Sequence, residues 1–386
     1  MTHLTRSALA AALLGLAAAP SQAQRAAPET AAFVVTLGTD TVAVEKYTRT
    51  ADSISGELVS RSPRTVTRSY RAWLNPDATV RRVEMTSRVP GSRQPPTVTA
   101  ATFTADSVFT RVQRGDSVFS FRVAAGKAFP LVNYSHAFYE QAMMHARAAR
   151  ADSLALQLAP LGANQTYAMV VRTVGADSMR LSNLAGVQHV ATDARGRLIG
   201  LNGFESTQKF IVTRLPDVDV DACAAEFARR DAANRGLGTL SPRDSAVADL
   251  GGAHLAVDYG RPFKRGRTVF GGIVPWGEVW RTGANAATGF TTTRDLEIGG
   301  AAVPAGKYTL WTLPTEAGWK LIVNRQTGQW GTEYDAAQDL VRIDMQTRRL
   351  AEPVEKFTIR LEPAGSGGVL RLQWDDTEAF VPVAVK

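Results

Sequence analysis

The chain has 386 residues, 45% of them hydrophobic and 21% charged, with one cysteine and a net charge of +8. This length allows a core large enough to fold without cross-links, and the single Cys223 excludes an intrachain disulfide and a zinc site built from several cysteines. The positive surplus lies before residue 241, because residues 241–386 contain 17 basic and 17 acidic residues. The arginines of the first part are scattered instead of clustered with aromatic side chains, so we expect no nucleic-acid partner.

Residues 1–23 have the pattern of a secretory signal peptide. Arg6 forms a short basic start, residues 13–19 are apolar, and residues 21–23 fit a small-x-small cleavage site. The apolar run is too short for a membrane span, and no later stretch reaches the roughly 20 apolar residues that a span needs. We therefore expect export to the periplasm or the medium, a mature chain that begins near Gln24, and no transmembrane anchor.

Residues 31–215 are predicted to form an antiparallel β domain, after a flexible tail at 24–30. Short apolar-polar alternations are separated by turn residues, and the Asp-Ser pairs at 106–107 and 116–117 are ten residues apart, which fits consecutive strands of a meander. One helix is expected at about 135–151, and a helix packed across such a sheet can leave an apolar groove. Later strands are expected at 166–173, 178–181, 187–192, 198–201 and 209–214.

Residues 216–243 are predicted to be a helical connector between two domains. Pro216 ends the last strand, a helix follows at 221–234, and the glycines at 236 and 238 end it. Cys223 and Phe227 lie one helical turn apart, so we expect Cys223 to be a buried apolar side chain.

Residues 244–386 are predicted to form a second β domain, shaped as a β-sandwich or jelly roll. Short strands and many glycine turns dominate it, with a hairpin of strands 308–313 and 319–324 and closing strands at 356–361, 369–374 and 381–385. The side chains of Trp319, Leu321 and Val323 share one face by their spacing, and Trp319 and Trp374 are expected in the core.

The densest stretch of the chain is residues 257–288, VDYGRPFKRGRTVFGGIVPWGEVWRTGANAAT. It resembles the uncharacterised bacterial family known as domain of unknown function 2911, with the pattern Y-x-R-P-x-x-x-G-R-x-x-F-G and then V-P-x-G-x-V-W-R-T-G-A-N-E-A-T. The resemblance covers about residues 245–386 and implies a fold but no reaction. This chain has Ala286 where the family has Glu, so any role of that carboxylate is missing here. The matching residues are Tyr259, Arg261, Pro262, Gly266, Arg267, Phe270, Gly271, Val274, Pro275, Gly277, Val279, Trp280, Arg281, Thr282, Gly283, Ala284, Asn285, Ala287 and Thr288, and later Gly299, Ala305, Gly306, Tyr308, Leu310 and Trp319.

Two glycine-bounded loops of this stretch, 260–266 and 277–285, are candidates for one binding cleft. Their arginines can bind a carboxylate or phosphate bidentately, and an exposed tryptophan can stack on a ligand. The alternative is structural: the cations pair with carboxylates or carbonyls, and Glu278 pairs with Arg281. The candidate ligand-binding residues are Arg261, Lys264, Arg267, Trp276, Glu278, Arg281, Asn285 and Tyr308.

These observations leave two classes of function. The first is a non-enzymatic envelope protein that binds an anionic, sugar-like or peptide ligand, or a partner, through the second domain. The alternative is a periplasmic hydrolase with Glu278 as acid or base. No histidine pair has metal-ligand spacing, so we expect no metal site, and no motif indicates a cofactor.

Overall fold

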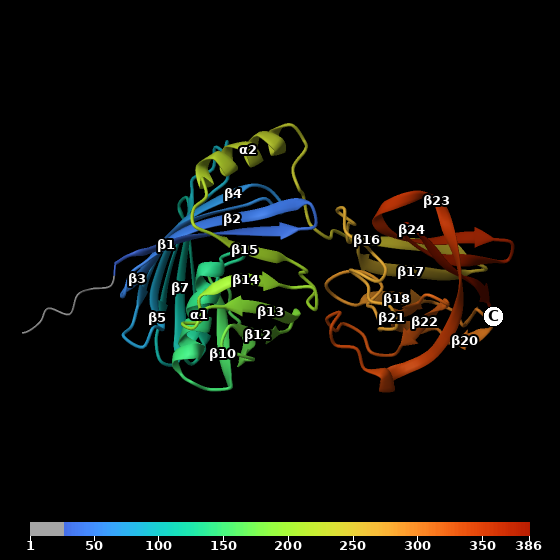
Figure 1. The fold of residues 1–386 in the computed structure, drawn as a ribbon. Helices are drawn as coiled ribbons and strands as arrows, with labels where there is room; N and C mark the ends of the chain where they lie inside the picture. The colour runs from blue at the N-terminus through green and yellow to red at the C-terminus, as the bar shows by residue number, and fades with distance from the viewer. Residues whose placement is uncertain (1–26) are drawn as a thin grey trace, which may run out of the picture.

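The computed structural model describes residues 27–386, and in it the chain forms two β-rich domains that lie side by side (Figure 1). The predicted signal peptide lies outside the described residues. The mainly β fold is confirmed, with one large sheet in each domain and two helices in the first part of the chain. Among the described residues, no helix is long and apolar enough to cross a membrane.

The N-terminal domain is a single sheet of fifteen strands in the order β8-β7-β6-β5-β4-β3-β2-β1-β15-β14-β13-β12-β11-β10-β9. Neighbouring strands are antiparallel except β9 and β10, which are parallel. The sheet curls so that β9 lies beside β5. The strands are β1 Glu29–Leu37, β2 Asp40–Arg49, β3 Ser53–Ser60, β4 Val66–Leu74, β5 Val80–Arg88, β6 Thr97–Phe103, β7 Ser107–Arg114, β8 Ser117–Ala124, β9 Ala128–Leu131, β10 Ser153–Pro160, β11 Tyr167–Thr173, β12 Ser178–Asn183, β13 Gly186–Thr192, β14 Leu198–Asn202 and β15 Ile211–Leu215.

Helix α1 (His136–Ala148) packs into this sheet and is fixed there by two buried carboxylates. Glu45 on β2 accepts hydrogen bonds from the backbone N–H groups of His136 (2.6 Å) and Ala137 (3.1 Å), which have no acceptor within the helix. Glu140 on α1 binds side chains or backbone of strands on both sides of the helix. Its partners are Tyr47, Arg49, Leu198 and Arg214.

Three local predictions for the N-terminal domain differ from the structure. The tail predicted at 24–30 is partly wrong, because β1 already begins at Glu29 and Glu29 pairs with Arg49 on β2. The last strand begins at Ile211 instead of residue 209, because Lys209 has a positive φ of 50° that a strand does not accept. Cys223 is half-buried instead of buried, and burial raises the pKa of its thiol.

The connector helix α2 (Val220–Ala232) covers the outer face of the N-terminal sheet, where Val220, Ala224 and Phe227 pack against Val44 and Val59. Its sequence explains its start, because the Asp219 carboxylate caps the helix by accepting from the backbone N–H of Ala222 at 2.8 Å. The chain then runs from residue 233 to 242 into the second domain.

The C-terminal domain is a sheet of nine strands in the order β16-β17-β18-β21-β22-β23-β24-β19-β20. The closing strands predicted at 369–374 and 381–385 are one long strand, β24, because Asp375 with a φ of 53° kinks the strand without ending it. The sheet folds over its own core, since β16 contacts both β23 and β24. The elements are β16 Arg243–Leu250, β17 Ala253–Gly260, β18 Thr288–Thr292, β19 Leu296–Ile298, β20 Ala301–Val303, β21 Gly306–Thr315, β22 Gly318–Asn324, the 3-10 turn η1 Ala336–Gln338, β23 Asp339–Ala364 and β24 Gly367–Val385.

Candidate functional site

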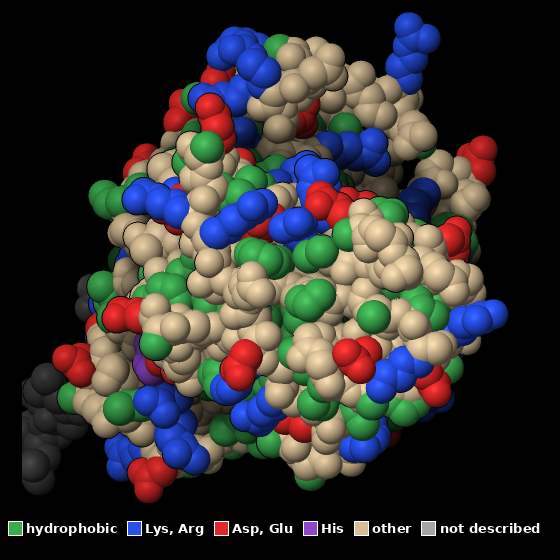
Figure 2. All heavy atoms as spheres, turned by 90° about the vertical axis from the view of Figure 1, so that its right-hand side faces the viewer, with side chains coloured by type: hydrophobic (Ala, Val, Ile, Leu, Met, Phe, Trp, Pro, Cys, Tyr) green, Lys and Arg blue, Asp and Glu red, His purple; other side chains and the backbone are tan. Residues whose placement is uncertain are grey.

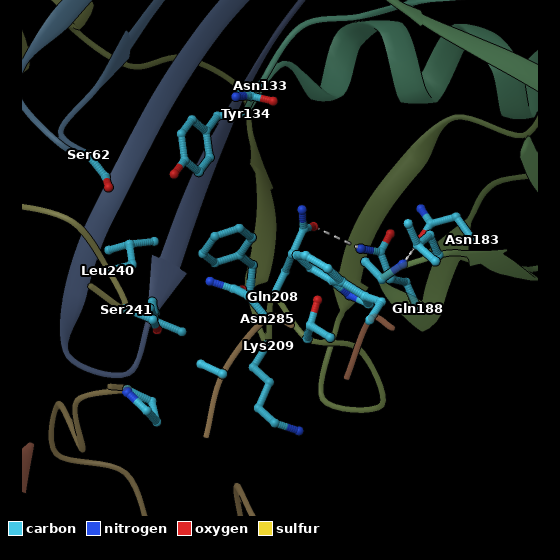
Figure 3. Close-up of a pocket in the computed structure, with 18 of the residues that line it drawn as sticks. Ser62, Asn133, Tyr134, Asn183, Gln188, Gln208, Lys209, Leu240, Ser241 and Asn285 are labelled. Carbon is cyan, nitrogen blue, oxygen red and sulfur yellow. Dashed lines mark hydrogen bonds between the residues drawn. The ribbon is translucent and has the colours of Figure 1, made fainter. Parts of the chain in front are cut away.

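A cavity of about 520 Å³ lies between the two domains (Figure 3). This volume is in the range of small-molecule sites, about 300–1,000 Å³. One wall comes from the N-terminal domain, mainly from α1, β9, β10, β14 and the segment before β15. The opposite wall comes from the loops between β17 and β18 and from Trp330 and Trp374, while residues 239–241 of the connector close one side.

The charged side chains of the cavity wall are all positive. Arg267 and Arg281 come from the C-terminal loops, and Lys209 comes from the N-terminal domain. The lining includes no Asp or Glu, and none of these three cations forms an ion pair with any residue that the structure describes. The cavity wall therefore carries an excess of positive charge, which carboxylates outside the lining, such as Glu278 and Glu205 near Lys209, offset only in part.

Arg281 is the least satisfied of the three cations. No hydrogen bond joins its guanidinium to the described part of the protein, and its Nε atom is fully buried without a partner. Burial lowers the pKa of Arg281 to about 10. Gly331 packs directly on this side chain: a Cβ at position 331 would lie 2.1 Å from the Cδ of Arg281. The backbone around Gly331 therefore fixes the position of the Arg281 side chain in the cavity wall. No hydrogen-bond acceptor of the described protein binds its guanidinium.

Burial and neighbouring positive charges lower the pKa of both Lys209 and Arg267. Burial, followed by repulsion from Arg281 and Arg267, lowers the pKa of Lys209 to about 8. Burial and the positive charge of Arg265 lower the pKa of Arg267 to about 10. Lys209 donates to the backbone oxygen of Phe204 at 2.5 Å, and Arg267 donates to the oxygens of Lys264 (3.0 Å) and Phe263 (2.6 Å). Backbone carbonyls orient these two cations but leave their charge available to an anion.

Two further side chains of the wall, Gln188 and Trp330, each have a buried polar atom without a hydrogen-bond partner in the described protein. Gln188, 4% exposed, donates through Nε2 to Gln208 at 3.3 Å, as drawn in Figure 3, while its buried Oε1 accepts from no described residue. The indole N–H of Trp330 is also buried without an acceptor. Buried polar groups are almost always paired, so such groups in one cavity indicate a site for a polar ligand or for water.

Contacts between the domains lie on either side of the cavity. Arg265 forms an ion pair with Asp40 (2.6 Å), and its backbone oxygen accepts from the N–H of Thr39 (3.2 Å). Gly38 permits this approach, because a Cβ there would lie 2.1 Å from the Arg265 oxygen. A second contact joins the hydroxyl of Thr332 to the backbone oxygen of Leu184 at 2.8 Å.

The structure brings three of the eight candidate residues to this cavity: Arg267, Arg281 and Asn285. Arg261 is held by Asp244 (2.6 Å), by the backbone oxygen of Phe357 and by Thr358. Lys264 pairs with Asp375 at 2.5 Å. Arg261 and Lys264 therefore agree with the structural alternative, because acceptors of the protein itself occupy their side-chain donors.

The remaining three candidates lie outside the cavity lining. Trp276, 37% exposed, stacks on Phe270 with ring centres 5.8 Å apart. Tyr308 is buried in β21 and donates to the backbone oxygen of Pro304 at 3.0 Å. Glu278 is exposed, and no ion pair joins it to Arg281 in the described chain, so the expected pair is not formed. Figure 2 shows that acidic and basic side chains are interspersed on the outer side of the C-terminal domain.

The predicted core tryptophans are confirmed, and one of them has a second role. Trp319 and Trp374 are 5% and 1% exposed. Trp374 also stacks on Trp280 with ring centres 5.8 Å apart, and both rings lie in the lining of the cavity.

An apolar groove beside the helix of the N-terminal domain was expected, but the residues of the N-terminal wall, including Tyr134, Tyr139, Gln188 and Lys209, were not predicted. These residues lie far apart in the chain, and no short motif connects them. The one local signal is the pair Gln208-Lys209, which interrupts the expected strand at 209–214.

The second domain matches a known protein family. Residues 241–383 match the family described as "Protein of unknown function (DUF2911)", and the N-terminal half matches no family. This confirms the resemblance seen in residues 257–288. No curated protein sequence matches the chain.

Two solved structures show distant likenesses. One is a DUF1089 family protein from Pseudomonas aeruginosa, 14% identical, with 42% of this chain and 90% of that chain covered and a TM-score of 0.32. The other, from Nitrosomonas europaea and provisionally described as AttH, is 11% identical, with 97% of this chain and 99% of that chain covered and a TM-score of 0.13. Neither likeness is close enough to carry an argument about function.

Proposed function

We propose that this is an exported, non-enzymatic binding protein that holds a small organic anion in the cavity between its domains. The observation that carries the proposal is the charge of the wall. Lys209, Arg267 and Arg281 surround the cavity, and neither the lining nor the ion pairs of the described residues supply a carboxylate to neutralise them. Keeping buried charges without a counter-charge costs folding energy, and a ligand that supplies the counter-charge recovers it.

The alternative, a hydrolase that uses Glu278, receives less support. A general acid or base must reach the reacting group to within hydrogen-bonding distance, directly or through one water. Glu278 is exposed and lies outside the lining of the cavity, although its charge is felt by Lys209. The cavity wall itself offers cations, amides and aromatic rings, which can bind an anion but do not form a paired carboxylate site.

Charge selectivity tests the proposal directly. We would titrate the purified mature protein with benzoate, benzyl alcohol and benzylamine, which share a ring but differ in charge, and follow binding by calorimetry. The expected order is benzoate first, with benzylamine not binding. Equal binding of all three, or preference for the amine, would overturn the proposed function.

A pair of variants locates the binding site. Arg281→Met removes a cation of the cavity, whereas Arg360→Met removes an exposed arginine on β23 whose side chain makes no hydrogen bond or ion pair in the described structure. Benzoate binding should weaken at least tenfold in the first variant and stay unchanged in the second. The export part is tested by fractionating cells and sequencing the N-terminus, which should lie near Gln24.

A further inference from the structure

We propose that the ligand is a single-chain amphiphile, with its anionic group on the cations of the C-terminal wall and its apolar chain on the N-terminal wall. This inference rests on the proposed function and adds the chemical class of the ligand. It comes from the apolar side chains that line the cavity beside its cations.

One part of the N-terminal wall is continuous with the hydrophobic core of its domain, and it lies beside polar side chains such as Asn183 and Gln188. Leu158 on β10, Leu201 on β14 and Phe210 belong to that core, and each is less than one-tenth exposed. Leu131 on β9 and Tyr139 on α1 are half-buried side chains that pack against it. All five line the cavity, so an apolar group that enters from the C-terminal side meets the edge of a packed core.

The titratable groups on this apolar wall are neutral at physiological pH. His136 stacks on Tyr139 with ring centres 5.8 Å apart, and burial lowers the pKa of its imidazole to about 4. Burial raises the pKa of the Tyr139 phenol to about 12. The one charged side chain that the N-terminal domain adds to the lining is Lys209, which repels Arg281 and Arg267 and so belongs to the cationic end.

The cationic end suits a carboxylate or a phosphate, since an arginine fork can bind either one. Arg281 has all its guanidinium donors unused by the described protein. A free inorganic anion would bind only the cations and would leave the apolar side chains of the cavity in contact with water. An amphiphile uses both ends, and its binding is therefore expected to tighten with chain length.

A chain-length series with a fixed head group tests this inference. We would measure the affinity of the intact mature protein for butyrate, hexanoate, octanoate, decanoate and dodecanoate, all below their micelle concentrations, and repeat it with alkyl phosphates. Burial of a CH₂ group is worth about 0.8 kcal/mol, so each added CH₂ should tighten binding by about fourfold until the cavity is full. The better of the two head-group series identifies the anion.

A bulky substitution on the apolar wall should remove the dependence of affinity on alkyl chain length. Leu131→Trp fills space at the half-buried wall, while Ile199→Trp places the same ring at a position 47% exposed on β14 and serves as the control. If Leu131→Trp loses cooperative unfolding, Leu240→Trp on the connector replaces it, because Leu240 is also half-buried in the lining. The expected result is loss of the chain-length slope in the blocked variant alone.

The outcomes separate the two proposals. If short and long anions bind equally, the inference of an amphiphile is wrong while the proposed anion site stands. If no anion of any length binds, the proposed function fails as well. If affinity still rises with alkyl chain length in the blocked variant, the alkyl chain of the ligand binds somewhere other than this wall, and the inference is overturned.

Discussion

Arg281 should stabilise the ligand complex while it destabilises the empty protein. Burial lowers its pKa from the ordinary arginine value to about 10, which corresponds to a cost of about 3 kcal/mol for carrying the charge in the folded state. A base with a lowered folded pKa carries this full cost at all pH values below about 10, and the cost is relieved only as the pH rises from about 10 toward the ordinary pKa of arginine. Near pH 7 the penalty is therefore complete.

Arg281→Met keeps most of the side-chain volume and removes the charge. We expect the ligand-free variant to unfold at a higher temperature than the wild type, by roughly 2–4 °C for each kcal/mol recovered. Urea unfolding should show the same gain, up to about 3 kcal/mol. The variant should at the same time lose benzoate binding, because its cavity no longer has this cation.

Arg360→Met is the matched control for this experiment and should change stability by less than about 0.5 kcal/mol. A fall in the unfolding temperature of Arg281→Met by several degrees would refute the reasoning. It would mean that Arg281 has a stabilising partner in the folded protein, and the structural alternative would then apply to this residue too.

Three further predictions follow from individual residues. Anion binding should weaken about tenfold between pH 7 and pH 9, because Lys209 with a pKa of about 8 loses its proton there; Lys209→Met should bind weakly with no such pH dependence by calorimetry. Gly331→Ala should destabilise the protein by about 1–3 kcal/mol and weaken anion binding, because its Cβ would press on Arg281, whereas Gly318→Ala meets no atom within 4 Å and should be neutral in urea unfolding. Glu140→Gln should cost about 3–5 kcal/mol in urea unfolding, because it leaves buried cations without their counter-charge, and a loss below 1 kcal/mol would contradict this view of the network.

Local signals predicted most of the fold. Alternating patterns and turn residues predicted the strands from β11 to β15 and the hairpin of β21 and β22, and the helix expected at 221–234 corresponds to α2, but β10 (Ser153–Pro160) was not predicted. The errors occur where tertiary contacts override local preference. Glu29 joins a strand because Arg214 on the neighbouring strand β15 and Arg197 just before β14 pair with it, and both lie more than 160 positions away in the chain, so no local pattern contains that information.

The site was predicted less well, for a related physical reason. The motif of residues 257–288 singles out unusual residues but does not distinguish cations with partners from cations without. Arg261 and Arg265 are held by Asp244 and Asp40, which lie 17 and 225 positions away. Arg281 was one candidate among eight in the sequence, and only the structure shows that no described carboxylate pairs with it. A binding cation is recognised by the absence of a protein partner among the described residues, which only the fold can reveal.

Backbone strain supports the same location independently of charge. Non-glycine residues with positive φ are uncommon, and they persist where surrounding structure forces them, often at functional sites. Three such residues line the cavity: Tyr134 (φ 69°), Lys209 (φ 50°) and Asn285 (φ 65°). They come from the N-terminal end of α1, from the segment before β15 and from the loop before β18, so three separate segments carry this cost at one place. Seven other non-glycine residues with positive φ lie outside the lining, so the strain agrees with the proposed site without being confined to it.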